Sequence, residues 1–520
     1  MSHGWERAKA RPAFHGPAAA RTRACILLGL IAMAYSHFER LSALDGSFLG
    51  IEDGVSHMHI GSVAVFEKGP FETADDGVDI ERIRRLMEAE LHRVPRYRQR
   101  LVQTPIFGQP VWVDDRHFNL AYHIRHTHLP RPGDHRQLKR LAARLMSQEL
   151  DRGKPLWEMW VVEGLEHDRF AIITKVHHCM IDGVGSVQLT GAMLRPTPEA
   201  SDPPEAPRWI PRPAPSSLAL VAAELGHRIV TPMKALASAA LAMARPWEAL
   251  NGLRDMTASV AATLGTGFHS ASPTPLNTDI GPHRRFDWTV ADLEALKAVR
   301  SRHGGTVNDV VLAVLAGAMR SFLHLRGLDP GALDFRVMVP VNVRDAHSRD
   351  HVGNRVAMMV VRLPLDERDP VKRLQRTVAE TARVKRSRQA AGTQMIESLS
   401  DATFPTIMVQ FANLTAMARP YNVVVTNVPG PPIPVYVAGA KLLVCYPLVP
   451  LFANQALGVA LFSYAGKLHW GFNADWDVLP DLHEVVEAVE REVAALTDGV
   501  REEPPPLPGF EPAHEGTSLQ

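Results

Sequence analysis

The sequence predicts an α/β protein with two domains, because segments typical of strands and segments typical of helices alternate in both halves of the chain. A stretch dense in proline, residues 195–217, lies between the halves and is typical of a linker. The length of 520 residues is enough for two sizeable hydrophobic cores. We therefore expect two α/β layers joined by a proline-rich crossover.

The first half contains segments rich in β-branched and aromatic residues at strand length. Apolar residues at helical spacing follow Asp79, which can cap a helix that begins at Ile80. The same spacing recurs from Leu138 to Leu145 and predicts a second helix. The expected strands of this half are 59–67, 156–165 and 169–176.

The second half repeats this pattern of strands and helices. Thr306 and Asp309 have the spacing of a helix N-cap, so we expect Asp309 to cap a helix rather than to take part in chemistry. The expected strands are 335–343, 355–363, 422–428 and 456–464, and the expected helices are 306–325, 371–387 and 480–496.

The composition divides the chain into five parts. An extension that is disordered or a start-site artefact is followed by an N-terminal domain, a linker with amphipathic helices, a C-terminal domain and a disordered tail. The corresponding ranges are 1–35, 36–194, 195–280, 281–498 and 499–520.

The overall charge and the cysteine pattern exclude several classes of protein. Lys and Arg number 57 against 56 Asp and Glu, so no net field attracts nucleic acid, and we expect none to bind. The three cysteines, Cys25, Cys179 and Cys445, lie far apart without a CxxC pair, which argues against a disulfide framework and a zinc knuckle. A reducing cytoplasm fits this pattern best.

An apolar run, residues 24–35, follows several arginines near the start of the chain. It is shorter than the roughly 20 residues of a membrane span, and no small-residue cleavage site follows it. We expect translation to begin at Met33, with a secretory signal as the alternative. Elsewhere no run of 18 or more apolar residues occurs, so membrane contact should be peripheral.

The Ala- and Leu-rich segment 216–244 is the best candidate for a lipid-facing surface. The alternative, which we favour, is a helix packed on the protein's own core. A lipid-facing segment would place the cytoplasmic protein peripherally on the inner face of the plasma membrane.

The residues best suited to chemistry follow the strand predicted at 169–176. His177 and His178 stand in a turn that brings side chains to the edge of a sheet, where a ligand can reach them. Histidine suits a general base because its pKa lies near neutral pH. Asp182, four residues after His178, can fold back to fix the loop, and Gly183 permits the turn.

Other histidines are weaker candidates for chemistry. Adjacent residues at a strand end point in opposite directions, so His177, His178 and Cys179 do not predict a zinc site, and we expect no metal. His57 and His59 share one strand face without a third ligand, which favours a solvated or hydrogen-bonded pair. We interpret three further histidines in the same way: His123, His126 and His128.

Residues His177 to Gly183 read HHCMIDG, which resembles the HHxxxDG signature of the bacterial wax ester synthase/diacylglycerol acyltransferase family. The resemblance spans about residues 41–496, which makes it more specific than one motif. Segments that resemble the family in order are LSALDGSFL (41–49), PLWEMWVVEGL (155–165), TVNDVVLAVLAGAMR (306–320), PVNVR (340–344), GN (353–354) and TNVPGP (426–431).

The resemblance implies two similar mixed-sheet α/β domains of the CoA-dependent acyltransferase type, which face a tunnel that CoA and acceptor enter from opposite sides. It also implies that His178 is the general base, that His177 supports it and that Asp182 is chiefly structural. The chain departs from the family in its arginine-rich extension before Met33 and in Cys179, which we expect to be a packing residue.

The implied mechanism needs no covalent acyl-enzyme, in agreement with the absence of a GxSxG motif. The tetrahedral oxyanion requires a hydrogen-bond donor, and Asn308 and Asn427 are candidates because each stands in a family-like motif. Three arginines are candidates to bind CoA phosphates or pair with Asp182, with a solvated basic face as the alternative: Arg96, Arg98 and Arg100.

The resemblance implies transfer of a long-chain acyl group from acyl-CoA, a substrate, to the hydroxyl of diacylglycerol, with no cofactor. The alternatives are a wax ester synthase acting on long-chain alcohols, an acyltransferase for soluble alcohols or amines, and a non-catalytic lipid-binding paralogue. The intact HHxxxDG motif argues against the last. Peripheral contact with a membrane or lipid droplet is expected.

Overall fold

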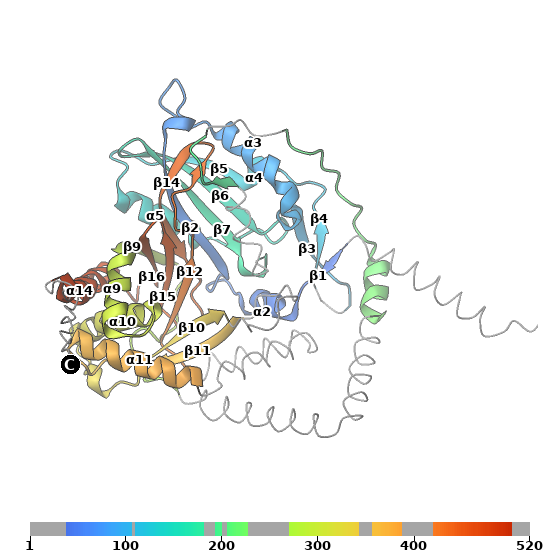
Figure 1. Cartoon of the computed structure of the whole chain (residues 1–520). Helices are drawn as coiled ribbons and strands as arrows, with labels where there is room; N and C mark the ends of the chain where they lie inside the picture. The colour runs from blue at the N-terminus through green and yellow to red at the C-terminus, as the bar shows by residue number, and fades with distance from the viewer. Residues whose placement is uncertain are drawn as a thin grey trace, which may run out of the picture.

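Two mixed β-sheets form the frame of the protein (Figure 1). The computed structural model describes residues 38–106, 110–180, 193–199, 205–226, 270–342, 356–386 and 420–501. Within these ranges, one sheet has seven strands in the order β5-β6-β7-β2-β14-β13-β8, and another has six in the order β11-β10-β12-β15-β16-β9. Each combines parallel and antiparallel pairs. The mixed α/β fold in two domains is therefore confirmed.

The strand bounds agree closely with the sequence prediction. The seven-stranded sheet comprises β5 (Ile124–His128), β6 (Trp157–Leu165), β7 (Arg169–His177), β2 (His59–Glu67), β14 (Ala440–Leu448), β13 (Tyr436–Val437) and β8 (Leu194–Arg195). The six-stranded sheet comprises β11 (Val356–Arg362), β10 (Arg336–Asn342), β12 (Val423–Pro429), β15 (Leu457–Tyr464), β16 (Lys467–Asp475) and β9 (Arg284–Asp292). A small sheet of β1 (Glu39–Arg40), β4 (Pro110–Asp114) and β3 (Gln99–Gln103) completes the frame.

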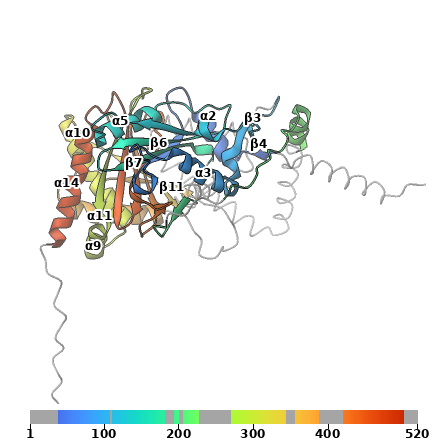
Figure 2. The same ribbon diagram turned by 90° about the horizontal axis from the view of Figure 1, so that it is seen from above.

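The longer helices cover one face of the six-stranded sheet (Figure 1). Their apolar residues and those of the strands form one large hydrophobic cluster. Figure 2 shows α10 and α14 at the opposite end of the molecule from β3 and β4. The bounds are α9 (Leu293–His303), α10 (Val307–Leu325), α11 (Pro370–Arg386) and α14 (Leu482–Arg501), and, in the first half, α2 (Ala43–Ile51), α3 (Ile80–Glu90), α4 (Leu120–His123) and α5 (His135–Met146).

The central helix α10 begins at a capping box, as the sequence predicts. The Thr306 hydroxyl accepts from the Asp309 N–H, and the Asp309 carboxylate accepts from the Thr306 N–H at 2.7 Å. Asp309 also accepts from the Thr381 hydroxyl of α11 at 2.7 Å. Among the described helices α10 alone has the length and hydropathy of a membrane span, but most of it is buried inside the protein. It is therefore the core helix of this domain.

The two halves of the chain are interwoven rather than merely adjacent. Strands β13 and β14 come from the second half of the sequence, yet β14 pairs with β2 in the seven-stranded sheet. Helix α5 of the first half packs against β9, where Lys139 forms an ion pair with Asp287. Arg284 at the start of β9 donates its backbone N–H to the Ser147 hydroxyl at 3.0 Å. These contacts fix one domain against the other, while the expected domain limits stay predictions.

The proline-rich linker is anchored to the first half. The Arg212 guanidinium donates to the Asp114 carboxylate at 2.8 and 3.0 Å. A helix follows at 217–226, and its Leu220 packs with Val111 and Val113 of β4. This part of the expected 216–244 segment thus packs on the protein, and residues 227–244 lie outside the described ranges.

Many elements were not predicted from the sequence, among them the strands β3, β4, β5, β9, β14 and β16 and the helices α2 and α9. In β14 buried and partly exposed residues alternate except at Val444. Strand β16 is buried along nearly its whole length and shows no alternation, which is typical of a strand covered on both faces. The extension before Met33 lies outside the described ranges. A short apolar helix, which the sequence favours at 187–194, also lies outside them except for its last two residues, and Leu194 belongs to β8.

Candidate active site

The histidine pair stands where β7 ends and a 3₁₀ turn begins. His177 is the last residue of β7, and η5 (His178–Met180) follows at once. The backbone is held on both sides, because the His177 N–H donates to the Leu156 carbonyl at 3.0 Å and the His178 N–H to the Met58 carbonyl at 2.8 Å. Neighbouring strands therefore fix the main chain at both histidines.

The His178 ring is stacked on the ring of Phe48, which comes from α2. Their centroids are 3.9 Å apart and their planes differ by 26°. Part of His178 remains exposed, but Nδ1 is buried and has no hydrogen-bond partner within the described ranges. Burial is the main cause that lowers the pKa of His178, to about 4, and a charge on His177 would act in the same direction. The ring is therefore neutral at physiological pH, the form that a general base requires.

His177 is buried and hydrogen-bonded at both ring nitrogens. The Cys179 N–H donates to Nδ1 at 3.1 Å, so the proton of the neutral ring is assigned to Nε2. Nε2 lies 3.1 Å from the carboxylate of Glu52 and donates to it. The ring thus connects the turn that carries His178 to a fixed anion.

Glu52 is the hub of this network, although sequence analysis did not identify it. Its side chain is only 7% exposed, and its carboxylate contacts Arg152 at 2.6 Å, His177 at 3.1 Å and His59 at 3.4 Å. Burial alone would raise the pKa of Glu52, but the hydrogen bonds from His177 and Arg152 and the nearby His59 ring outweigh it and hold the pKa far below the usual value. The carboxylate is therefore ionised.

His57 and His59 are not solvated, which corrects one expectation. They do share a face, with stacked rings 5.4 Å apart, but both side chains are buried. His59 lies against Glu52 and His177, which come from other elements, and spacing along the chain does not reveal such contacts. Burial lowers the pKa of His59 to about 3 and also lowers that of His57.

The other histidine cluster has no metal-site geometry either. His123 donates from Nδ1 to the Trp157 carbonyl at 2.8 Å, and His126 lies 3.1 Å from Glu163, while His128 is exposed. Throughout the part of the chain that the structure describes, no group of three or more His, Cys, Asp or Glu side chains is arranged to hold a metal ion.

Asn308 and Asn427 are brought together, although 119 residues separate them in the chain. Asn308 lies in the first turn of α10, and Asn427 lies in β12. The Asn427 Nδ2 group donates to Asn308 Oδ1 at 2.6 Å, in an exposed position. Two residues from separate segments that resemble family motifs therefore form one polar pair.

The remaining candidate residues have varied positions. Cys179 is buried in the hydrophobic core, and burial raises its thiol pKa, so it is a packing residue as expected. Asp182 and Gly183 lie outside the described ranges.

The three arginines near residue 98 already have partners. Arg96 stacks over Trp112 at 4.6 Å and Arg98 over Trp209 at 5.0 Å, and Arg100 lies 4.0 Å from a carboxylate. Their binding to CoA phosphates stays a prediction.

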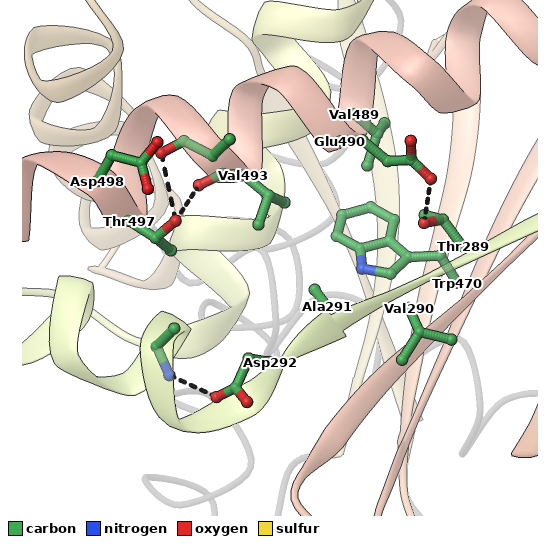
Figure 3. A pocket seen from close by; sticks show the side chains of 12 residues that line it. Thr289, Val290, Ala291, Asp292, Trp470, Val489, Glu490, Val493, Thr497 and Asp498 are labelled. Atoms are coloured by element: carbon green, nitrogen blue, oxygen red, sulfur yellow. Dashed lines mark hydrogen bonds between the residues drawn. The ribbon is translucent and has the colours of Figure 1, made fainter. Parts of the chain in front are cut away.

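A separate pocket lies between β9 and α14 (Figure 3). Its wall includes Trp470 and Val493, and its rim carries a hydrogen bond of 2.6 Å from the Thr289 hydroxyl to Glu490. The histidines and asparagines described above do not line it, so it is distinct from the candidate active site.

Comparison with known proteins assigns both halves of the chain. Residues 41–311 match the wax ester synthase/diacylglycerol acyltransferase catalytic domain, and residues 352–497 match the WS/DGAT C-terminal domain. A Mycobacterium tuberculosis protein named probable diacylglycerol O-acyltransferase tgs1 is 34% identical over 463 residues, which cover 88% of this chain and 95% of that protein.

Solved structures support the same assignment. The wax ester synthase/diacylglycerol acyltransferase from Marinobacter aquaeolei VT8 has a TM-score of 0.65 and 26% identity, over 89% of this chain and 100% of that one. The TRI3 trichothecene 15-O-acetyltransferase from Fusarium sporotrichioides shares the fold, with a TM-score of 0.53 and 12% identity over 88% and 95% of the chains. The chain therefore belongs to the wax ester synthase/diacylglycerol acyltransferase family and is an acyltransferase whose substrates are acyl-CoA and an alcohol.

Proposed function

We propose that this acyltransferase transfers a long-chain acyl group from acyl-CoA to diacylglycerol, with His178 as the general base. The observation that carries the proposal is the His178 ring, which burial keeps neutral at the end of β7 inside the HHxxxDG motif. Diacylglycerol is favoured as the acceptor because the relative from Mycobacterium tuberculosis is named for it.

The reaction needs two proton transfers, one to His178 and one from it. His178 accepts the proton of the acceptor hydroxyl as the hydroxyl oxygen attacks the thioester carbonyl carbon. The tetrahedral intermediate then collapses, the carbon–sulfur bond breaks, and the imidazolium returns the proton to the CoA thiolate. The products are the ester and free CoA. Asp182 and Gly183 are proposed to hold the loop after His178 in place.

The oxyanion of the intermediate is proposed to bind at the asparagine pair. Because Asn308 Oδ1 accepts from Asn427, the Nδ2 group of Asn308 is the end of the pair that can donate to an oxyanion. Asn427 then orients Asn308 rather than contacting the oxyanion itself. This arrangement assigns different roles to the two asparagines.

The first experiment measures CoA release by the purified protein from palmitoyl-CoA with diacylglycerol, with hexadecanol and without acceptor. Release that depends on diacylglycerol and falls at least about a hundredfold in His178→Ala supports the proposal. Release with hexadecanol alone would replace it by wax ester synthesis. A His178→Ala variant near wild-type activity, with His177→Ala inactive, would move the base to His177.

We propose that the protein works in the cytoplasm, in peripheral contact with the inner membrane face or a lipid droplet. Leu218 and Leu225 are exposed on the helix at 217–226 and support this location. Fractionation of cells that express the wild type or Leu218→Ser/Leu225→Ser tests it. An unchanged membrane-bound fraction in the double variant would contradict a role for this helix.

A further inference from the structure

Helix α2 contacts the catalytic turn through residues that the reaction itself does not use. It packs against η5, which begins with His178. Phe48 and Glu52 are four residues apart at its C-terminal end and therefore lie on one side of the helix. Phe48 reaches His178 and Glu52 reaches His177. A single helix thus contacts both histidines.

Phe48 restricts the plane of the His178 ring. A stacked contact at 3.9 Å between centroids leaves no space for the imidazole to turn toward α2. The backbone of His178 is also fixed, because its N–H donates to the Met58 carbonyl. Small errors in the position of a base cost large factors in rate, so this contact bears directly on catalysis.

Glu52 restricts the second histidine. An ionised carboxylate accepts a hydrogen bond from Nε2 of His177 only when that nitrogen carries the proton, which leaves Nδ1 free to accept from the Cys179 N–H. Cys179 lies in the same 3₁₀ turn as His178. The hydrogen bonds therefore run from Glu52 through the His177 ring to the turn that carries the base.

The carboxylate itself is firmly held. Arg152 donates to Glu52 at 2.6 Å and to the Leu49 carbonyl at 3.3 Å, and the Met58 N–H donates to the carboxylate at 3.2 Å. With these donors and both histidines around it, the buried carboxylate has little capacity left for a substrate. Its position therefore suits orientation rather than proton transfer.

We propose that α2 is the positioning element of the active site, in which Phe48 fixes the plane of the His178 ring and Glu52 fixes the tautomer of His177 and hence the catalytic turn. The proposal rests on the proposed function of His178. Neither Phe48 nor Glu52 is a catalytic residue, because both act through the histidines.

The test compares kcat and KM for palmitoyl-CoA in Glu52→Ala, Glu52→Gln, Phe48→Ala and Phe48→Leu. Leu49→Ala is the matched control, because Leu49 lies on the same helix and packs on the hydrophobic core. We expect kcat to fall about ten- to a hundredfold in Glu52→Ala, with KM changed by less than about threefold. Glu52→Gln keeps the size of the side chain and should retain part of kcat, and Phe48→Leu should retain more than Phe48→Ala.

The dependence of kcat/KM on pH is a readout that does not change when a substitution only destabilises the fold. Removal of the Phe48 ring exposes His178, so in Phe48→Ala the acid limb should shift toward the ordinary histidine pKa of about 6.5. Among the described residues, His177 is the ionisable group that acts on the His178 ring. The acid limb of Phe48→Leu and Leu49→Ala should stay where it is in the wild type.

Histidine ¹⁵N spectra supply a second readout, with His177→Asn to assign the signal. The wild type should show the Nε2–H tautomer of His177, and Glu52→Ala should show a mixture. Equal loss of kcat in Glu52→Ala, Phe48→Ala and Leu49→Ala, with an unchanged acid limb and tautomer, would overturn the positioning role. An active His178→Ala would overturn the proposed function instead, and the positioning role with it.

Discussion

At the residue scale, the chemistry of the site depends on what surrounds each polar group. His178 and His177 are neighbours in the chain, but one ring stacks on an aromatic side chain and the other is hydrogen-bonded to a carboxylate. The His178 ring is neutral at physiological pH, and the His177 ring donates from Nε2 and accepts at Nδ1. Identical residue types thus acquire different roles from their contacts.

The low pKa of His178 predicts an unusual pH profile. A histidine with a pKa of about 4 stays in its base form at pH 5.5, where an ordinary histidine with a pKa of about 6.5 is mostly protonated. Because only the neutral form accepts a proton, kcat/KM should stay nearly constant from pH 7.5 down to about 5.5. An acid limb centred near pH 6.5 in the wild type would contradict the buried environment of the ring.

The asparagine pair predicts unequal effects of two similar substitutions. Asn308→Ala removes the proposed oxyanion donor and should lower kcat about a hundred- to a thousandfold. Asn427→Ala should have a smaller effect, because Asn427 only orients Asn308.

The control for the pair is Asn422→Ala, which removes a buried amide that donates to the Ser272 carbonyl. It should lower Tm rather than kcat. A larger loss of kcat in Asn427→Ala than in Asn308→Ala would reverse the assignment of donor and orienting residue.

At the element scale, the first turn of α10 holds two neighbouring polar residues with different contacts. Both Asp309 carboxylate oxygens accept hydrogen bonds, one from the Thr306 N–H and one from the Thr381 hydroxyl. Asn308, the preceding residue, is instead paired with β12. The N-terminus of α10 therefore anchors the helix and presents an amide at the same time.

Asp309→Ala should accordingly act on stability more than on rate. Loss of a capping residue costs about 1 kcal/mol, and here the Thr381 hydroxyl also loses its partner. We expect a fall in Tm with a smaller change in kcat, the opposite of Asn308→Ala. Differential scanning fluorimetry and the CoA-release assay distinguish the two, and an inactive Asp309→Ala with unchanged Tm would show that capping is not its main role.

The packing of α10 on α14 and α11 depends on Gly317. A Cβ at this position would overlap the Glu492 carboxylate and the Arg373 guanidinium, which form a buried ion pair between α14 and α11. Gly317→Ala should therefore destabilise the protein by about 1–3 kcal/mol, the usual cost of overpacking.

Thermal melting of Gly317→Ala measures this cost. Gly69→Ala, at a position where a Cβ meets nothing within 4 Å, is the control and should melt like the wild type. An unchanged Tm in Gly317→Ala would mean that α10, α11 and α14 can move apart to make room for the methyl group without loss of stability.

At the scale of the whole molecule, several histidines are buried as neutral rings. Burial lowers the pKa of His59 to about 3 and those of His123 and His469 to about 4. In the unfolded chain these pKa values return to about 6.5, so the unfolded state binds more protons below that pH. Stability contributed by the neutral rings is present above pH 6.5 and is lost as the pH falls toward 4.

We therefore expect Tm to fall by at least about 5 °C between pH 7 and pH 5. His469→Phe provides the control, because His469 lies near the aromatic rings of Tyr446 and Tyr464, and its two ring nitrogens have no hydrogen-bond partner among the described residues. The melting temperature of the His469→Phe variant should depend less on pH than that of the wild type. A wild-type Tm that is constant over this range would contradict the neutral burial of these histidines.

Local pattern in the sequence was enough for the fold class and for many of the longer elements. Strand β2 (His59–Glu67) has the predicted bounds, and the caps at Asp79 and Asp309 were identified from spacing alone. The reason is that strand content, helical periodicity and capping depend on residues close together in the chain. The HHxxxDG motif is equally local, and it led to the family.

Only the tertiary structure decided which distant residues meet. Glu52 and His177 are 125 residues apart, and Asn308 and Asn427 are 119 apart, while β14 enters a sheet whose other long strands come from the first half of the chain. Such contacts depend on how complete layers pack and not on spacing along one segment. The sequence by itself therefore determined many of the longer elements, the histidine motif and the family, whereas the burial of His57 and His59 and the contacts of Glu52 required the packed fold.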